Sequence, residues 1–240
     1  MKAPTKSTVD VGGLAIMPFL SMESALDHVI RDGKVQSGVG VSVNSEIVMM
    51  ARSDANLRNH INAASLRFAD GIGVVKTVAS KGVPNVRIPG CEFWEALMQR
   101  ATQADIPVLL IGAKPEVNAA AVDKLQKAGL ASVSGIHGYI NDEQYIYDEI
   151  DVRQPKIITV ALGAPKQEQL IARLHARYPD AFYLGVGGTY DVFTGHVKRA
   201  PQLFCRLHLE WFYRLCAQPS RIGRQFNLVH YLALHMMRRL

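Results

Sequence analysis

The chain has 240 residues, of which 48% are hydrophobic and 20% are charged. This balance is typical of a folded globular protein and argues against a disordered one. The formal net charge is +6, but its distribution is uneven: residues 197–240 carry eight Lys or Arg against one acid, Glu210. This segment predicts an anionic partner, which could be a phospholipid surface, a diphosphate or nucleic acid.

Cysteine content and hydropathy indicate the compartment. The chain has three cysteines, Cys91, Cys205 and Cys216. They form no CxxC pair, which argues against a disulfide framework or a zinc site and favours a reducing compartment. No stretch approaches the roughly 18 apolar residues that a membrane-spanning helix needs. The apolar run 11–20 is not a good signal peptide, because Asp10 and Pro18 interrupt it and no small-residue cleavage site follows. We expect a cytoplasmic protein whose membrane contact is peripheral.

Short apolar runs alternate with helical patterns from residue 38 onward. Strands are predicted over 38–43, 66–69, 107–111, 131–134, 156–162 and 181–184. Helices are predicted after Asn44, from Asp54 to about Ala64, after the Gly71 and Gly73 turn, after Pro89-Gly90, and over 115–128, 141–150 and 165–177. The alternation predicts an α/β fold, a Rossmann-like parallel sheet with helices on both faces.

The C-terminal segment has a different pattern. Two helices are predicted, over 202–217 and 220–238, with Pro219 between them. In a helical projection of the second, one arc is basic and the opposite arc is apolar. The pattern is typical of a helix on an anionic membrane; the alternative is an ordinary terminal helix packed on the body. We expect a Rossmann-like domain over 1–200 and, as part of the same functional unit, a basic amphipathic helical tail over 201–240.

Candidate ligand-binding positions follow the predicted strands. Ligands of parallel α/β sheets bind beyond the carboxyl ends of the strands, where helix N-termini present N–H groups to anions. Five segments hold such positions: 44–46, 70–73, 112–114, 163–167 and 187–191. The glycine turns Gly112-Ala113-Lys114 and Gly187-Gly188 could cradle a diphosphate, a plain structural turn being the alternative for each.

Three side chains stand out among these positions. Asp70 would stand at the sheet edge as a general base, unless it caps the next helix. Arg87 and Gln167 could hold sugar or phosphate oxygens, unless they are merely solvated. No HExxH motif, Asp-x-Asp pair, GxGxxG or GxxxxGK[ST] motif occurs, so neither a metal nor a cofactor is expected.

Five motifs in order point to one family. They are Ala-Asp-Gly-Ile-Gly at 69–73, Arg-Ile-Pro-Gly at 87–90, Gly-Ala-Pro-Lys-Gln-Glu at 163–168, Gly-Val-Gly-Gly-Thr-Tyr-Asp at 185–191 and Gly-His-Val-Lys-Arg-Ala-Pro at 195–201. Their order and spacing over about residues 35–235 resemble the WecG/TagA/CpsF glycosyltransferases, glycosyltransferase family 26.

The resemblance implies a specific reaction. Residues 189–201 and 210–221 are most similar to family members that transfer N-acetyl-D-mannosaminuronic acid from UDP to undecaprenyl-diphosphate-linked N-acetylglucosamine, in enterobacterial common antigen synthesis. Inversion at the anomeric carbon without a metal or other cofactor is implied, and UDP-N-acetylmannosamine is the alternative donor. The implied partners are the UDP-sugar, the lipid-linked acceptor and the anionic inner face of the cytoplasmic membrane, and not nucleic acid. A homo-oligomer is left open.

The resemblance also assigns residues. Asp70 would take the proton from the acceptor 4-hydroxyl, with Arg87 and Gln167 beside it in the catalytic group. The donor site expected from strand ends and motifs together comprises Asn44, Gly112, Lys114, Gly163, Gly187, Gly188 and Asp191. The lipid diphosphate and membrane would be bound by Lys198, Arg199, Arg214, Arg221 and Arg224. Val43 and Ser45 flank Asn44 where many relatives have proline, so a different local backbone is expected there.

Two other functions fit parts of the chain. An NAD(P)-dependent oxidoreductase could use the same kind of sheet, but the dinucleotide fingerprint is missing and the basic tail has no role in it. A non-catalytic membrane- or nucleic-acid-binding protein would explain the tail, but not the polar groups at successive strand ends. A glycosyltransferase accounts for both features.

Overall fold

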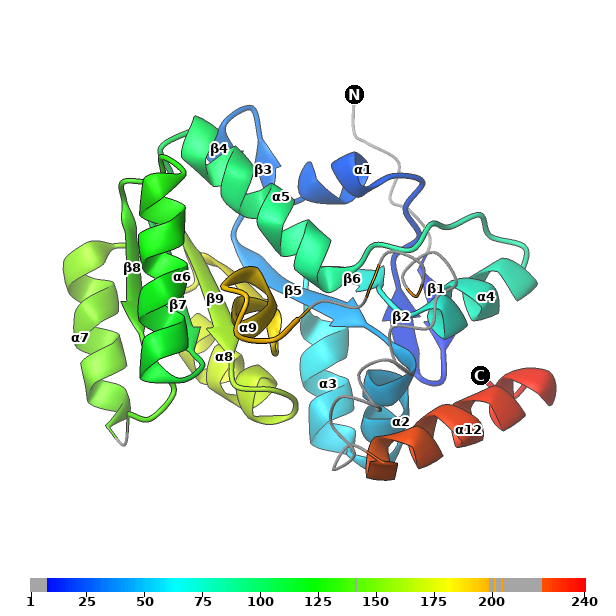
Figure 1. Cartoon of the computed structure of the whole chain (residues 1–240). Coiled ribbons are helices and arrows are strands. Elements are labelled where there is room, and N and C mark those ends of the chain that lie inside the picture. Colours follow the sequence, from blue (N-terminus) through cyan, green and yellow to red (C-terminus); the bar gives the residue numbers. More distant parts are fainter. Residues whose placement is uncertain (1–7, 141, 199–200, 202–203, 205–221) are drawn as a thin grey trace.

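The central element is a six-stranded parallel sheet (Figure 1). The structure, a computed structural model, describes residues 8–140, 142–198, 201, 204 and 222–240. The strands are β5 (Gly38–Val43), β6 (Leu66–Ala69), β7 (Val108–Gly112), β8 (Val133–Ile136), β9 (Ile157–Ala161) and β10 (Phe182–Gly185). They are ordered β6-β5-β10-β9-β7-β8, and every neighbouring pair is parallel. The expected α/β sheet is confirmed.

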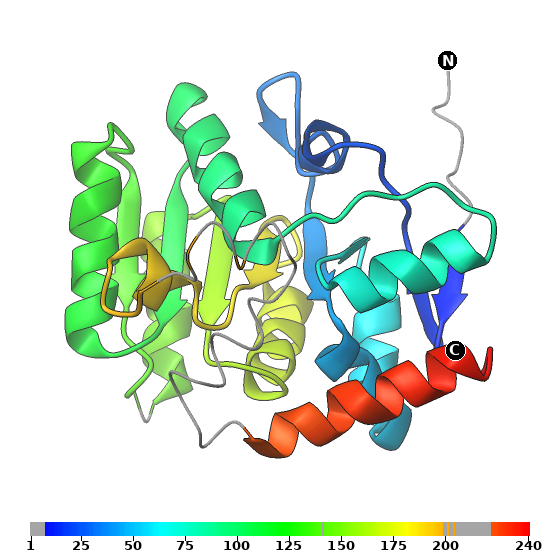
Figure 2. The same cartoon turned by 45° about the vertical axis from the view of Figure 1, so that its right-hand side comes forward.

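Helices cover both faces of this sheet (Figures 1 and 2). They are α1 (Met22–Leu26), α2 (Ser45–Ser53), α3 (Ala55–Ala63), α4 (Ile72–Ser80), α5 (Gly90–Gln103), α6 (Pro115–Lys127), α7 (Glu143–Arg153), α8 (Lys166–Arg177), α9 (Thr189–Phe193) and α12 (Ile222–Met236). One face packs on α5, α6 and α9 and the other on α7 and α8. All residues of β7 and β9 are buried, which explains why these strands read as unbroken apolar runs.

The N-terminal segment forms small elements that the sequence pattern did not predict. They are the hairpin of β1 (Val9–Val11) with β2 (Leu14–Ile16), helix α1, and the hairpin of β3 (Ile30–Arg31) with β4 (Lys34–Val35). Strands of two or three residues are too short to show the alternation of apolar and polar residues that predicts a strand. The apolar run considered as a signal peptide contains β2, and Leu14 and Ile16 are fully buried.

Most predicted boundaries lie within two residues of the observed ones. The prediction for β8 was two residues early, because Gly135 and Ile136 pair with Leu110 and Ile111 of β7 and so extend the strand. Helix α9 was not predicted. Its five residues follow a glycine turn, and a single turn of helix is too short to show a helical period.

The C-terminal helix α12 has two different faces. One packs on α2 and α4, with Tyr231 and Leu234 buried. Burial raises the pKa of Tyr231 to about 12, and its neutral hydroxyl lies 2.7 Å from the Thr77 hydroxyl of α4. A Cβ on Gly73 would lie 3.0 Å from the Tyr231 ring, so this glycine permits the close packing. The predicted tail helix over 202–217 lies outside the described residues.

The other face of α12 is apolar and exposed to solvent. Phe226 is 73% exposed and Met236 is 83% exposed, and Val229 lies between them. The helix therefore packs on the body, as the alternative interpretation expected, but it does so without burying its most apolar arc. Within the described residues, no helix combines the length and the apolar character needed to cross a bilayer.

Tyr231 should anchor α12 to the body. Replacing it with alanine removes a fully buried aromatic ring and the hydroxyl partner of Thr77, so Tyr231→Ala should lower the free energy of unfolding by about 3–5 kcal/mol. Urea denaturation followed by circular dichroism measures this change. Phe226→Ala on the same helix is the matched control and should change the value by less than about 0.5 kcal/mol. Equal effects of the two changes would contradict the packing described.

Candidate active site

A cavity of about 880 Å³ opens at the carboxyl ends of β5, β6, β9 and β10. After β5 the chain turns toward β6, whereas after β10 it turns the other way into α9, which packs on α5 and α6. Neighbouring strands whose connections diverge in this way leave a crevice between them. The cavity lies at this switch point of the sheet.

Nine of the predicted site residues line this cavity. They are Asn44, Asp70, Arg87, Gly163, Gln167, Gly187, Gly188, Asp191 and Lys198. The sequence separates them by up to 154 positions, and the parallel strand order brings them together. The structure thus gathers most of the expected catalytic and donor-binding residues around one space.

Other predicted residues do not line it. Gly112 is the last residue of β7 and Lys114 follows it, and this strand lies on the far side of β9 from the cavity. Gly112 pairs with Ala161 of β9 and Lys114 precedes the first turn of α6, so the observed contacts of this turn are structural. Arg199, Arg214 and Arg221 lie outside the described residues. The backbone of Arg224 belongs to α12, and its side chain is outside the described part.

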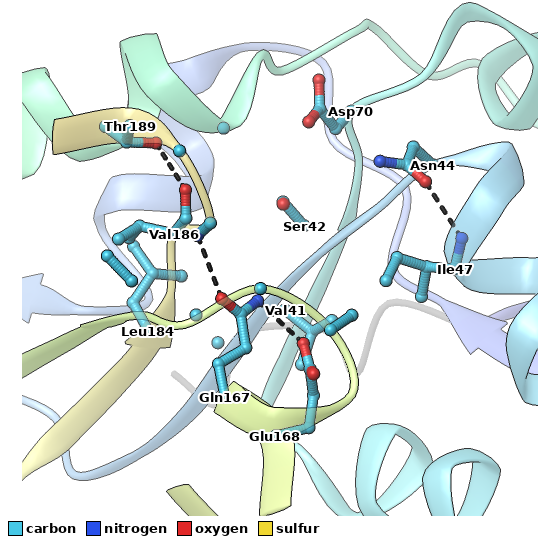
Figure 3. Close-up of a pocket in the computed structure, with 18 of the residues that line it drawn as sticks. Val41, Ser42, Asn44, Ile47, Asp70, Gln167, Glu168, Leu184, Val186 and Thr189 are labelled. Carbon is cyan, nitrogen blue, oxygen red and sulfur yellow. Dashed lines mark hydrogen bonds between the residues drawn. The ribbon is translucent and has the colours of Figure 1, made fainter. Parts of the chain in front are cut away.

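Asp70 follows the last residue of β6 and faces the cavity (Figure 3). It does not cap the next helix, because the N-cap of α4 is Gly71 and no side chain bonds there. Arg87 donates from Nε to the Asp70 carbonyl at 2.7 Å, and its Nη2 lies 3.8 Å from Asp70 Oδ1. A Cβ on Gly90 would be only 3.3 Å from Asp70 Oδ2. The first turn of α5 therefore lies directly against this carboxylate.

Asn44 makes a structural hydrogen bond and directs its amide nitrogen at the cavity. Its Oδ1 accepts a hydrogen bond from the Ile47 N–H at 3.0 Å and so caps α2. Figure 3 shows its amide nitrogen pointing from the cap toward the cavity. The capping bond fixes the side chain in an orientation in which the N–H₂ group can donate to a ligand.

Gln167 and Glu168 form a buried pair at the start of α8. Gln167 Oε1 accepts from the Gly187 N–H at 3.0 Å, and its Nε2 donates to Glu168 Oε1 at 2.9 Å. The two bonds fix the orientation of the Gln167 amide and tie the turn after β10 to α8. Burial raises the pKa of Glu168, while the bond from Gln167, the backbone N–H of Glu168 and the charge of His60 oppose the rise.

Asp191 reaches the cavity because its neighbour is anchored in the core. The Tyr190 hydroxyl donates to the Thr159 carbonyl of β9 at 2.9 Å and lies 2.6 Å from the Thr159 hydroxyl. The Tyr190 ring packs on Trp94 of α5. Adjacent residues on a helix point about 100° apart, so burying Tyr190 directs Asp191 toward the cavity.

Several helices begin at the cavity wall. The first residues of α2, α4 and α5 line it, as does the second residue of α8; they are Ser45, Ile72, Gly90 and Gln167. Each helix start brings N–H groups and the positive end of a helix dipole to the cavity wall. Helix N-termini of this kind are suited to bind a diphosphate.

Some cavity residues were not predicted as site residues. Ser42 lies within β5, and Figure 3 shows its hydroxyl near the middle of the cavity. Glu168 stands next to Gln167 in a motif that the sequence did reveal, so its position was a usable signal. Leu228 comes from α12, and no local pattern links this helix to the strand ends.

One comparison with known proteins identifies the family. A family model described as "Glycosyl transferase WecG/TagA/CpsF family" matches residues 9–240. The match includes all six sheet strands and α12. It therefore extends over both the cavity and the helix that contributes Leu228 to it.

The pKa of Glu168 predicts how stability depends on pH. When folding raises the pKa of a carboxyl group, the folded state favours the protonated form. The free energy of unfolding therefore falls as pH rises through the pKa that the group has in the folded protein. Glu168→Gln does not titrate, so its melting temperature relative to wild type should be higher at pH 8 than at about pH 4 (thermal unfolding). Glu143→Gln is the control: the pKa of Glu143 is lowered by Arg173, so the difference should have the opposite sign. A pH-independent effect of Glu168→Gln would contradict the prediction.

Proposed function

The chain belongs to the WecG/TagA/CpsF glycosyltransferase family, and we propose that it transfers N-acetyl-D-mannosaminuronic acid from UDP to undecaprenyl-diphosphate-linked N-acetylglucosamine. The product would be a lipid-linked intermediate of enterobacterial common antigen. The motif resemblance supports this donor, and UDP-N-acetylmannosamine is the alternative. The observation that carries the transferase chemistry is the meeting of Asp70 with four helix N-termini in one cavity.

The UDP moiety would lie against the turn after β10. Gly187 and Gly188 line the cavity there, and their small size lets the backbone approach a phosphate. Asp191, which also lines the cavity, would hold the ribose or the base. The starts of α2, α4, α5 and α8 supply N–H groups for the diphosphate without a metal ion.

The reaction would be a single displacement at the anomeric carbon. Asp70 takes the proton from the acceptor 4-hydroxyl, the hydroxyl oxygen forms the new bond to the anomeric carbon, and the bond to UDP breaks on the opposite side, inverting the configuration. The negative charge that develops on the departing UDP is stabilised by the helix N-termini, with Arg87 and Lys198 as nearby cations. Arg87 also fixes the turn that carries Asp70, through its bond to the Asp70 carbonyl.

The lipid-linked acceptor requires the protein to work at a membrane surface. The apolar face of α12, formed by Phe226, Val229 and Met236 and lying beside exposed Arg238 and Arg239, supports contact with an anionic bilayer. Apolar side chains enter the interface while arginines meet the headgroups. Leu228 of the same helix lines the cavity, so membrane contact and site lie close together. We place the protein on the inner face of the cytoplasmic membrane.

A transfer assay tests the proposed reaction. The protein is incubated with UDP-N-acetylmannosaminuronic acid and a prenyl-diphosphate-linked N-acetylglucosamine in EDTA, and the lipid product is detected by mass spectrometry. Product should form at the same rate as without EDTA, because backbone dipoles and cations replace the metal. The Asp70→Asn variant should lose about 10²–10⁴-fold in turnover, the range for general acid–base catalysis.

The controls separate the possible failures. Asp70→Asn should still bind UDP in calorimetry, and Asp123→Asn on the exposed surface of α6 should behave as wild type. No transfer with either N-acetylmannosaminuronic acid or N-acetylmannosamine donors would contradict the proposed enzyme. Near-normal turnover of Asp70→Asn would remove Asp70 from its role as base.

Membrane binding should depend on the apolar face of α12. The double change Phe226→Ser and Met236→Ser removes two exposed apolar side chains, so partitioning onto phosphatidylglycerol vesicles should fall about tenfold or more in a sedimentation assay. The control pair is Tyr145→Ser with Val152→Ser, which removes exposed apolar side chains of α7. Equal sedimentation of wild type and the α12 variant would contradict membrane contact through this face.

A further inference from the structure

One oxygen of Glu168 has no hydrogen-bond partner in the part of the chain that the structure describes. Its residue is only 7% exposed, and Oε1 accepts from Gln167. The other oxygen, Oε2, is buried and has no hydrogen-bond partner among the described residues. A buried polar atom without a partner costs about 1–3 kcal/mol. The protein without a ligand is therefore less stable by this amount than it would be if a hydrogen-bond donor reached Oε2.

Holding Gln167 in place does not explain this carboxylate. Orienting the Gln167 amide needs one acceptor, which Oε1 supplies at 2.9 Å. A glutamine at position 168 could supply the same acceptor without burying an ionisable group. The second oxygen thus makes no hydrogen bond among the described residues, and the cavity that Glu168 lines offers room for a ligand group that could supply one.

The position of Glu168 indicates which ligand group that is. The carboxyl lines the cavity near Val41, and Figure 3 shows it across the cavity from Asp70, with the Ser42 hydroxyl between them. In the proposed reaction the base must reach a hydroxyl that is attacking the anomeric carbon, so the transferred sugar has to lie beside Asp70. The opposite side of that sugar then faces the Gln167–Glu168 pair.

We propose that Glu168 is a donor-sugar-binding residue, whose carboxylate accepts through Oε2 a hydrogen bond from a hydroxyl or amide N–H of the transferred sugar. This inference rests on the proposed function. A carboxylate only accepts hydrogen bonds, so it selects a donor group and disfavours a sugar carboxylate at the same spot. Through Gln167 the same residue links the sugar to the Gly187 turn, where the diphosphate would lie.

Glu168→Gln is a sharp probe because it keeps the size of the side chain. If the new amide keeps its oxygen toward Gln167, its N–H₂ group meets the donor group of the sugar. If the amide turns over, two N–H₂ groups meet at Gln167. In the first orientation a sugar amide N–H loses its acceptor, while a sugar hydroxyl can still accept from the new N–H₂ group but loses a bond to a charged partner. Because hydrogen bonds to a charged group are stronger than neutral ones, the affinity for a sugar nucleotide should fall in both cases if the carboxylate contacts the sugar.

Isothermal titration calorimetry with UDP and with UDP-N-acetylmannosamine tests the inference. For Glu168→Gln, the affinity for the sugar nucleotide should fall about ten- to hundredfold, as expected for a hydrogen bond to a charged group, while the affinity for UDP changes less than about twofold. Glu143→Gln, the same change outside the cavity, should match wild type for both ligands. Circular dichroism verifies folding, and Glu168→Asp, which shortens the side chain, should show the same selective loss if the glutamine variant does not fold.

Three other results would each overturn the inference. Unchanged affinity for the sugar nucleotide would show that Oε2 does not contact the sugar. An equal loss for UDP and UDP-N-acetylmannosamine would show that Glu168 acts only through the Gly187 turn. Wild-type protein that binds neither ligand would overturn the proposed function as well, which distinguishes that failure from the first two.

Discussion

Parallel pairing of β5 with β10 determines where everything else at the site can lie. The two strands are far apart in the sequence, and their registered pairing brings the ends of β5, β6, β9 and β10 to one edge. Helices that follow these strands must begin at that edge, with their unpaired N–H groups directed at the same space. A cavity walled by helix N-termini is thus a consequence of the sheet order.

The polar contacts around the cavity mostly serve to hold backbone turns. Gln167 bonds the turn after β10, Arg87 bonds the turn after β6, and Asn44 caps the helix after β5. Each of these side chains therefore lines the cavity and also holds part of its wall in place. The structural bonds hold these side chains in one orientation, so a ligand that enters the cavity meets groups that are already fixed in place. Glu168 differs in that its second oxygen is buried and has no hydrogen-bond partner among the described residues.

Helix α12 joins the site to the outer surface. Tyr231 fixes this helix against α4, where its ring lies close to Gly73. Gly73 follows Asp70 by three residues in the sequence. The same helix places Leu228 at the cavity and leaves Phe226 and Met236 in solvent. In the proposed function, this arrangement allows a lipid-linked acceptor to stay at the bilayer while its sugar reaches the base.

The amino-acid sequence by itself determined the α/β class, the strands from β5 onward and most residues of the candidate site. It could do so because buried parallel strands are apolar runs and because the motif residues follow those runs directly. It could not show that Gly112 and Lys114 lie apart from the other predicted site residues. Strands β7 and β10 both end in a glycine turn, and only the order of strands in the sheet separates the two turns. It also could not show that α12 buries Tyr231 and exposes Phe226, or that Oε2 of Glu168 is buried without a hydrogen-bond partner among the described residues. Those features depend on which surfaces meet across long sequence separations, and the tertiary structure alone decides that.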